Sequence, residues 1–268
     1  MDDRCPPTFY RGAMFGEETL LVGLRDRLML LSPWDGVAVS AFLLAWWGIG
    51  WLIDRETATR PSVAVLMARY RREWMEVFVQ RTARMFDASI LYNLRQGTTF
   101  FASGAMLGIG GLLALIGNSE RLVGVARDLS LAAAPAAVWE MKLLLCLLVL
   151  TNAFLKFVWS QRLFGYCAIL MAAVPEDPAD PRARMRARQA AEVNITAARS
   201  FNRGLRSVYF ALAALAWLIG PIGLLVATGI TLVVLWRREY ASRSRSIILG
   251  NIAAVPGLAG PDAGSGSE

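Results

Sequence analysis

Four stretches of this chain are long and apolar enough to cross a membrane, and they constrain its fold more than any other feature. They lie at about residues 35–53, 99–117, 138–159 and 207–236. A helix needs roughly 20 mainly apolar residues to span a hydrocarbon core of about 30 Å. Hydrophobic residues make up 56% of the 268 residues, which is above the range of an ordinary soluble domain. The sequence therefore predicts an all-α, polytopic transmembrane helical bundle with four spans.

The segments between these stretches differ strongly in charge. Segments 54–98 and 160–206 carry eight Arg each, whereas segment 118–142 carries three Lys and Arg together. Basic connections stay on the cytoplasmic side, so both Arg-rich segments are predicted to be cytoplasmic in a bacterial inner membrane. Four spans then place both termini outside. The Arg residues that follow the last stretch do not fit this orientation: Arg237, Arg238, Arg243 and Arg245.

The last stretch, 207–236, has two interpretations. A hairpin that turns at Gly220 and Pro221 would bring the four Arg residues inside. Its two arms of about 15 residues would each reach only about 22 Å, short of the membrane core. We therefore expect one long helix that Pro221 kinks, with the hairpin as the alternative.

Amphipathic sequence predicts extended cytoplasmic helices. Segment 62–86 has apolar residues on one helical face and charged residues on the other. The third span is expected to continue to about Ala173, and from about 183 nothing breaks a helix before Gly204. These helices and the spans form one domain over 35–245. It follows an N-terminal segment, 1–34, in which 17–31 suits an interfacial or a packed helix, and precedes a tail, 246–268, that is expected to be disordered.

Polar residues recur on the third span at a spacing of four. Asn152, Lys156 and Ser160 therefore share one helical face. In one interpretation Lys156 snorkels to the interface while Asn152 bonds a neighbouring helix. In the other, this stripe lines a hydrated vestibule or an anion path.

The second span carries small residues on one face. Gly104, Gly108 and Gly111 lie at positions i, i+4 and i+7. Glycines at this spacing let helices approach closely, within one chain or between subunits. We therefore expect self-association as well as contact with the lipid bilayer.

Five motifs occur along the chain in the order RREWMEVFVQRTARMFD, FFASGAMLGIGG, FVWSQRLFGY, FNRGLRSVYFALAALAWLIGP and WRREY. With these motifs the chain resembles the bacterial and plant membrane proteins of the domain of unknown function 599 family over roughly 35–245. It departs from the family pattern at SQRLFGY, where a more polar run similar to SLRQYNY is expected. The resemblance implies a fold but no activity.

The resemblance also marks polar residues near the predicted inner ends of the spans. We expect these residues to form a buried ion-pair girdle, and the alternative is a pocket for an anion or a lipid headgroup. They are Arg72, Arg81, Asp87, Trp159, Arg162, Tyr166, Asn202 and Arg206.

The composition argues against an enzyme. The chain has no His, which removes the commonest general base and metal ligand, and we expect no cofactor. It also lacks a phosphate loop, a nucleophile motif and a catalytic carboxylate pair. In a membrane protein the basic excess suits topology and anionic lipid rather than nucleic acid. We predict a homo-oligomeric structural or accessory protein of the inner membrane. The alternative is a channel or transporter for a small, anionic solute.

Overall fold

The computed structural model describes residues 30–55, 61–118, 124 and 135–250. Over these residues all regular secondary structure is helical, which confirms the predicted all-α fold. The elements are α2 (Pro33–Asp54), α3 (Val63–Gln80), α4 (Met85–Gly117), α6 (Ala136–Ala172), α7 (Pro181–Leu215), the short 3-10 helix η1 (Ala216–Leu218), α8 (Pro221–Tyr240) and α9 (Arg243–Ile248).

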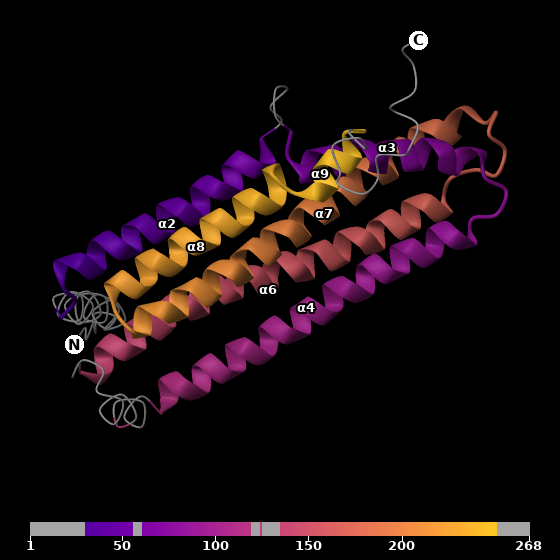
Figure 1. The fold of residues 1–268 in the computed structure, drawn as a ribbon. Helices are drawn as coiled ribbons and strands as arrows, with labels where there is room; N and C mark the ends of the chain where they lie inside the picture. Colours follow the sequence, from indigo (N-terminus) through magenta and orange to yellow (C-terminus); the bar gives the residue numbers. More distant parts are fainter. Residues whose placement is uncertain (1–29, 56–60, 119–123, 125–134, 251–268) are drawn as a thin grey trace, which may run out of the picture.

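Four helical segments of the described chain are long and apolar enough to cross a membrane: α2, α4, α6 and the segment Pro221–Ile248, which comprises α8 and α9. Figure 1 shows α2, α4, α6, α7 and α8 as long rods that run the length of one bundle. The prediction of a helical bundle with four apolar spans is confirmed, and the protein is a membrane protein in contact with the lipid bilayer.

The last apolar stretch is not one kinked helix, so the prediction over 207–236 is wrong. The chain leaves α7 at Leu215, turns through η1, and returns in α8 alongside α7 and α2 (Figure 1). Gly220 makes the turn with a φ of 146°, a conformation that glycine adopts far more readily than other residues. Pro221 then begins α8, where its fixed φ suits a first helical position. The hairpin alternative describes the structure.

The first arm of this hairpin is longer than the apolar stretch that predicted it. α7 passes through the whole bundle: Arg206 contacts Asp54 at the end of α2, and Trp217 in η1 donates to Asp35 at the start of α2. Its polar side chains meet partners on α2 and α6, so this arm does not need an apolar surface on every side. A length argument based on apolar residues alone therefore underestimated the arm.

The hairpin brings the end of α8 to the same end of the bundle as α3. Tyr70 of α3 donates to the carbonyl of Ile248 at 3.3 Å, and the backbone N–H of Ala64 donates to Glu239 at 3.3 Å. We call this end, with α3, α9 and the α6–α7 connection, the basic end. Four spans would place both termini outside, but in the structure α2 begins at the opposite end of the bundle and α9 ends at the basic end, so the described chain starts and finishes at opposite ends. The termini themselves lie outside the described residues.

The helices at the basic end differ from the predictions in their limits. α3 stops at Gln80 rather than 86, because Arg81 is extended (φ −81°, ψ 130°) and the chain turns into α4. α4 and α6 extend beyond the predicted spans, α6 to Ala172 much as expected. α9 occupies 243–248, so the expected disordered tail does not begin at 246. Residues 17–29 and 251–268 lie outside the described part of the chain.

The core lies between α2, α6 and α7. Phe42 and Phe210 meet there with ring centroids 5.5 Å apart, and neither is exposed. α4 packs chiefly against α6 and leaves long apolar side chains uncovered, with Leu107 78% exposed. Such exposure suits a helix that faces lipid.

Candidate functional site

A cavity of about 810 Å³ opens between α2, α6 and α7 near the basic end. We call it the cationic pocket, because four cationic side chains face a single carboxylate. Its polar lining consists of Asp54, Arg55, Asn152, Lys156, Arg203, Arg206 and Ser207, and its other lining residues are Leu43, Trp46, Trp47, Gly50 and Trp51.

The carboxylate of the cationic pocket is held by two guanidinium groups. Arg203 donates through Nε to Asp54 at 2.7 Å, and Arg206 donates through Nη2 to both Asp54 oxygens at 3.0 and 3.1 Å. Arg203 and Arg206 lie three residues apart on α7, so both side chains reach the same point beside the last residue of α2. The Arg206 side chain is only 7% exposed, which makes this a largely desolvated ion pair.

Arg206 keeps one donor group without a partner. Its Nη1 is buried and has no hydrogen-bond acceptor among the described residues. A buried donor left unsatisfied costs about 1–3 kcal/mol, and more when the group is charged. The Arg206 guanidinium, which pairs with Asp54 and also interacts electrostatically with Glu239, therefore keeps one N–H group that can donate to an anionic oxygen.

The polar stripe of α6 faces α7. Asn152 donates to Ser207 Oγ at 3.1 Å, and Ser160 donates to the carbonyl of Ala197 at 2.7 Å. Lys156 lies between them, partly exposed, on the wall of the cationic pocket. Within the described part of the chain its ammonium has no hydrogen bond and no ion pair. Lys156 thus contributes an unneutralised charge to the pocket.

The cationic pocket ends at the apolar core. Phe42 and Phe210 fill the α2–α7 interface beyond it. A second polar group lies past this plug, at the opposite end of the bundle, where Asp35 accepts from Trp217 at 2.7 Å and Lys142 lies 6.0 Å from the Trp217 ring. The two polar regions are therefore separated by apolar packing.

The eight residues of the predicted girdle do not come together. Arg206 lines the cationic pocket, whereas Asp87 is fully buried and accepts from Trp74 and Arg81 at 2.6 Å each. Asn202 lines a neighbouring cavity of about 380 Å³. The other members of the predicted girdle lie on α3 and on an exposed face of α6.

Trp159, Arg162 and Tyr166 share this exposed face of α6. Their side of the helix holds one weak contact, from Arg162 to Tyr166 at 3.3 Å. Trp159 and Tyr166 are 48% and 42% exposed. This face does not contribute to the cationic pocket.

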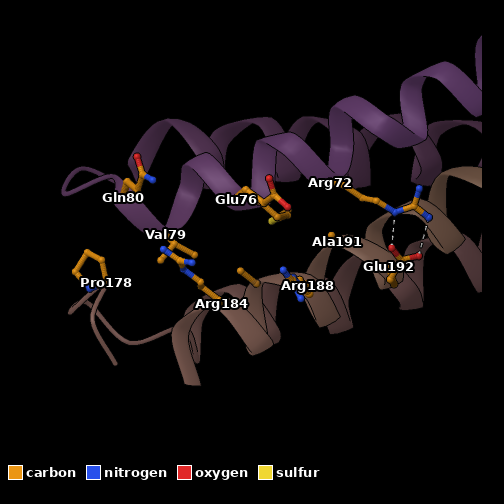
Figure 2. A pocket seen from close by; sticks show the side chains of 11 residues that line it. Arg72, Glu76, Val79, Gln80, Pro178, Arg184, Arg188, Ala191 and Glu192 are labelled. Carbon is orange, nitrogen blue, oxygen red and sulfur yellow. Dashed lines mark hydrogen bonds and ion pairs between the residues drawn. The ribbon is translucent and has the colours of Figure 1, made fainter. Parts of the chain in front are cut away.

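Arg72 lies at one end of a slot of about 690 Å³ between α3 and α7 (Figure 2). It donates to Glu192 at 2.6 and 3.2 Å, and this contact lowers the pKa of that carboxyl. Arg184 and Arg188 reach from α7 along the same slot, as Figure 2 shows, but both are exposed to solvent. The slot contains no buried polar atom that lacks a partner, so it is a weaker candidate than the cationic pocket.

The glycine face of α4 divides into two parts. A Cβ on Gly108 would lie 2.8 Å from Cδ2 of Leu150, so Gly108 serves the packing of α4 on α6. Gly104 and Gly111 have no neighbour within 4 Å of such a Cβ, and they open onto an apolar groove of about 520 Å³.

Sequence reasoning placed Lys156 and Arg206 in separate groups and missed Asp54, Arg203 and Ser207. The available signal was the spacing of Arg203 and Arg206, together with a carboxylate at the end of an apolar stretch. Nothing periodic links residues 54 and 206, because their pairing depends on how α7 passes α2. No group of three or more Cys, Asp and Glu side chains in the described residues is placed to hold a metal ion.

Comparisons with known proteins identify a family for this chain but assign no activity to it. Neither the curated proteins nor the solved structures give a match. A family described as a protein of unknown function, DUF599, matches residues 37–244. This match includes every residue of the cationic pocket and most of the chain, and the protein therefore belongs to the DUF599 family of membrane proteins.

Proposed function

We propose that the protein binds an anionic group in the cationic pocket and does not transform it. The observation that carries this proposal is the buried Nη1 of Arg206, which lacks an acceptor among the described residues. Lys156 on α6 adds a positive charge to the lining of the pocket and has no carboxylate partner among the described residues. A phosphate or carboxylate oxygen would satisfy both groups through charge-assisted hydrogen bonds.

The proposal includes an orientation in the bacterial inner membrane. The described residues of the Arg-rich segments 54–98 and 160–206 lie toward the basic end, and Arg238 and Arg245 after the last span join them there. An excess of Arg beside the spans favours the cytoplasmic side. The mouth of the cationic pocket then lies close to the cytoplasmic interface, where anionic headgroups and soluble anions both have access.

The test is stabilisation by an added anion. Inorganic phosphate, added to the purified protein at constant ionic strength, should raise the melting temperature in a saturable way, because a ligand that binds only the folded state stabilises it. Lys156→Gln removes a charge but no contact, so this variant should fold normally and lose most of the anion response.

Arg162→Gln is the matched control, because Arg162 lies on the exposed face of α6, and it should respond as the parent does. Arg206→Gln should abolish the response as well, at some cost in stability. Equal responses of Lys156→Gln and Arg162→Gln, to phosphate and to anionic lipid alike, would refute anion binding in the pocket.

A structural or accessory role through self-association is a second candidate. The groove beside Gly104 and Gly111 favours it, because a smooth apolar face with room for side chains suits a helix of a second copy. Gly104→Leu should then shift the particle to a smaller species in detergent without loss of fold. Gly108→Leu, which meets Leu150, should instead destabilise the single chain. An unchanged assembly in Gly104→Leu would leave lipid as the occupant of the groove.

Transport of a small anion is a third candidate. Polar groups at both ends of the α2–α7 interface favour it, since only the Phe42–Phe210 contact and its neighbours separate them. Phe42→Ala should then increase chloride or phosphate flux in liposomes above that of the parent protein. Equal and undetectable flux in both would remove this candidate and leave binding.

A further inference from the structure

We infer that the occupant of the cationic pocket is the headgroup end of a single anionic phospholipid, whose acyl chains run along α2. This inference rests on the proposed function and names the class of ligand.

The pocket changes from polar to apolar along α2. Asp54 and Arg55 lie at the basic end, and Trp51, Trp47 and Leu43 follow at successive turns toward the middle of the bundle. The 11 residue-to-residue steps from Leu43 to Asp54 cover about 16 Å of helix. A phospholipid has the same order of groups over the same direction, with its phosphate at the interface and its chains toward the bilayer centre. A free anion would use only the polar end.

The apolar wall of the pocket is open to the side. Trp47 is 73% exposed and Trp51 is 56% exposed, although both lie within an apolar membrane span. Indole rings at this depth pack against the upper part of acyl chains and tolerate the nearby headgroup region. Arg55 lies 5.0 Å from the centre of the Trp51 ring, which holds a cation at the level of a lipid phosphate. The pocket therefore admits a ligand from the bilayer.

The charge of the pocket selects among lipids. Asp54 pairs with both Arg203 and Arg206, and the half-buried Glu239 of α8 also interacts electrostatically with Arg206. Lys156 and Arg55 have no carboxylate partner in the described residues, so they leave the pocket with an excess of positive charge. A headgroup with a net negative charge gains from this excess. A zwitterionic headgroup brings its own ammonium close to these cations, which costs part of that gain. We therefore expect preference for an anionic phospholipid.

Native mass spectrometry of the purified full chain, with dioleoyl phosphatidylglycerol and dioleoyl phosphatidylcholine as matched probes, tests this preference. One phosphatidylglycerol should be retained per chain, with an affinity roughly tenfold higher than that of phosphatidylcholine. This factor corresponds to a difference of about 1.4 kcal/mol in binding free energy. Glycerol 3-phosphate, which has the charge without the chains, should bind more weakly than phosphatidylglycerol by at least a similar factor.

Two variants separate the head from the chain. Lys156→Gln should reduce the affinity for phosphatidylglycerol and for glycerol 3-phosphate alike. Trp47→Ala should reduce the affinity for phosphatidylglycerol and leave glycerol 3-phosphate binding unchanged. Trp34→Ala, which removes a Trp that is 69% exposed at the other end of α2, is the matched control and should bind both as the parent does.

The outcomes distinguish the ligand class from the proposed function. If Lys156→Gln weakens glycerol 3-phosphate binding but Trp47→Ala has no effect on phosphatidylglycerol, the pocket takes a soluble anion and the lipid inference is overturned. If Lys156→Gln changes the binding of neither phosphatidylglycerol nor glycerol 3-phosphate, the proposed anion binding in the cationic pocket is refuted together with the lipid inference. Equal retention of both lipids would also overturn the inference, because the charge would then play no part.

Discussion

Two adjacent Arg side chains on α3 illustrate how differently one residue type behaves at the basic end. The Arg71 guanidinium donates to the side-chain oxygen of Asn194, and burial lowers the pKa of Arg71. The side-chain amide of Asn194 donates in turn to Sγ of Cys167, so the three residues form a chain of hydrogen bonds. Arg72 instead pairs with Glu192, whose side chain is 58% exposed. The half-buried Arg71 is therefore bound by a neutral amide, and the exposed Arg72 by a carboxylate.

The Arg72–Glu192 ion pair should contribute little to the free energy of unfolding, and this contribution should disappear in acid. The contact with Arg72 lowers the pKa of Glu192 below its ordinary value of 4.5. A lowered pKa in the folded state contributes stability above pH 4.5, and this contribution is lost as the pH falls through the lower, folded value. A double-mutant cycle with Arg72→Gln and Glu192→Gln should give a coupling of about 0.2–1 kcal/mol at neutral pH. Coupling that persists unchanged in strong acid would contradict this account.

At the scale of elements, the most extensive helix contact among the described residues is between α6 and α7. A Cβ on Gly204 would lie 2.6 Å from the Phe157 ring, which is fully buried and packs against Phe101 and Phe201 at 5.6 Å each. The ring cannot move away without disturbing this cluster. Gly204 therefore sets the distance at which α7 passes α6, and with it the position of Arg206 beside Asp54.

Gly204→Ala should destabilise the protein by about 1–3 kcal/mol, because overpacking a filled interface outweighs the better helix propensity of alanine. Gly165→Ala in α6 is the matched control. No atom lies within 4 Å of the place that its added methyl group would take, and the same propensity should stabilise it by up to about 1 kcal/mol. Thermal unfolding in one detergent compares the two. A Gly204→Ala protein as stable as Gly165→Ala would show that the α6–α7 contact is loose.

Local pattern was sufficient to predict the elements and not their partners. The apolar lengths of α2, α4 and α6 predicted three of the spans, and the unbroken run from 183 predicted a helix up to Gly204, which α7 includes and passes. The hairpin could not be predicted from apolar length, because α7 replaces apolar surface with contacts such as Arg206–Asp54 and Asn152–Ser207. The same contacts build the cationic pocket, so the hairpin and the site were missed for one reason.

For the whole molecule, the hairpin predicts which positions share a side of the membrane. Single cysteines at Arg72, Arg186 and Arg243, in a variant without Cys5, Cys146 and Cys167, should be labelled from the same side. A cysteine at Asn118, at the end of α4, should be labelled only from the other side. The reagent is a membrane-impermeant maleimide applied to oriented vesicles. Labelling of Arg243 together with Asn118 would rule out the return of α8.

The polarity of α7 has a consequence for how the protein is made. Arg203 and Arg206 each disfavour insertion of an isolated helix, by a few kcal/mol at a helix centre and by less beside the end of α2, where these two residues lie. Their counter-ion, Asp54, is synthesised about 150 residues earlier and already lies in place at the end of α2. We expect α7 to enter only onto the preassembled α2–α6 surface, with α8 closing over it. The order in which the helices enter the membrane would then depend on the Asp54 carboxylate. In a nascent Asp54→Asn chain, the segment before Gly220 should stay accessible to protease until synthesis is complete.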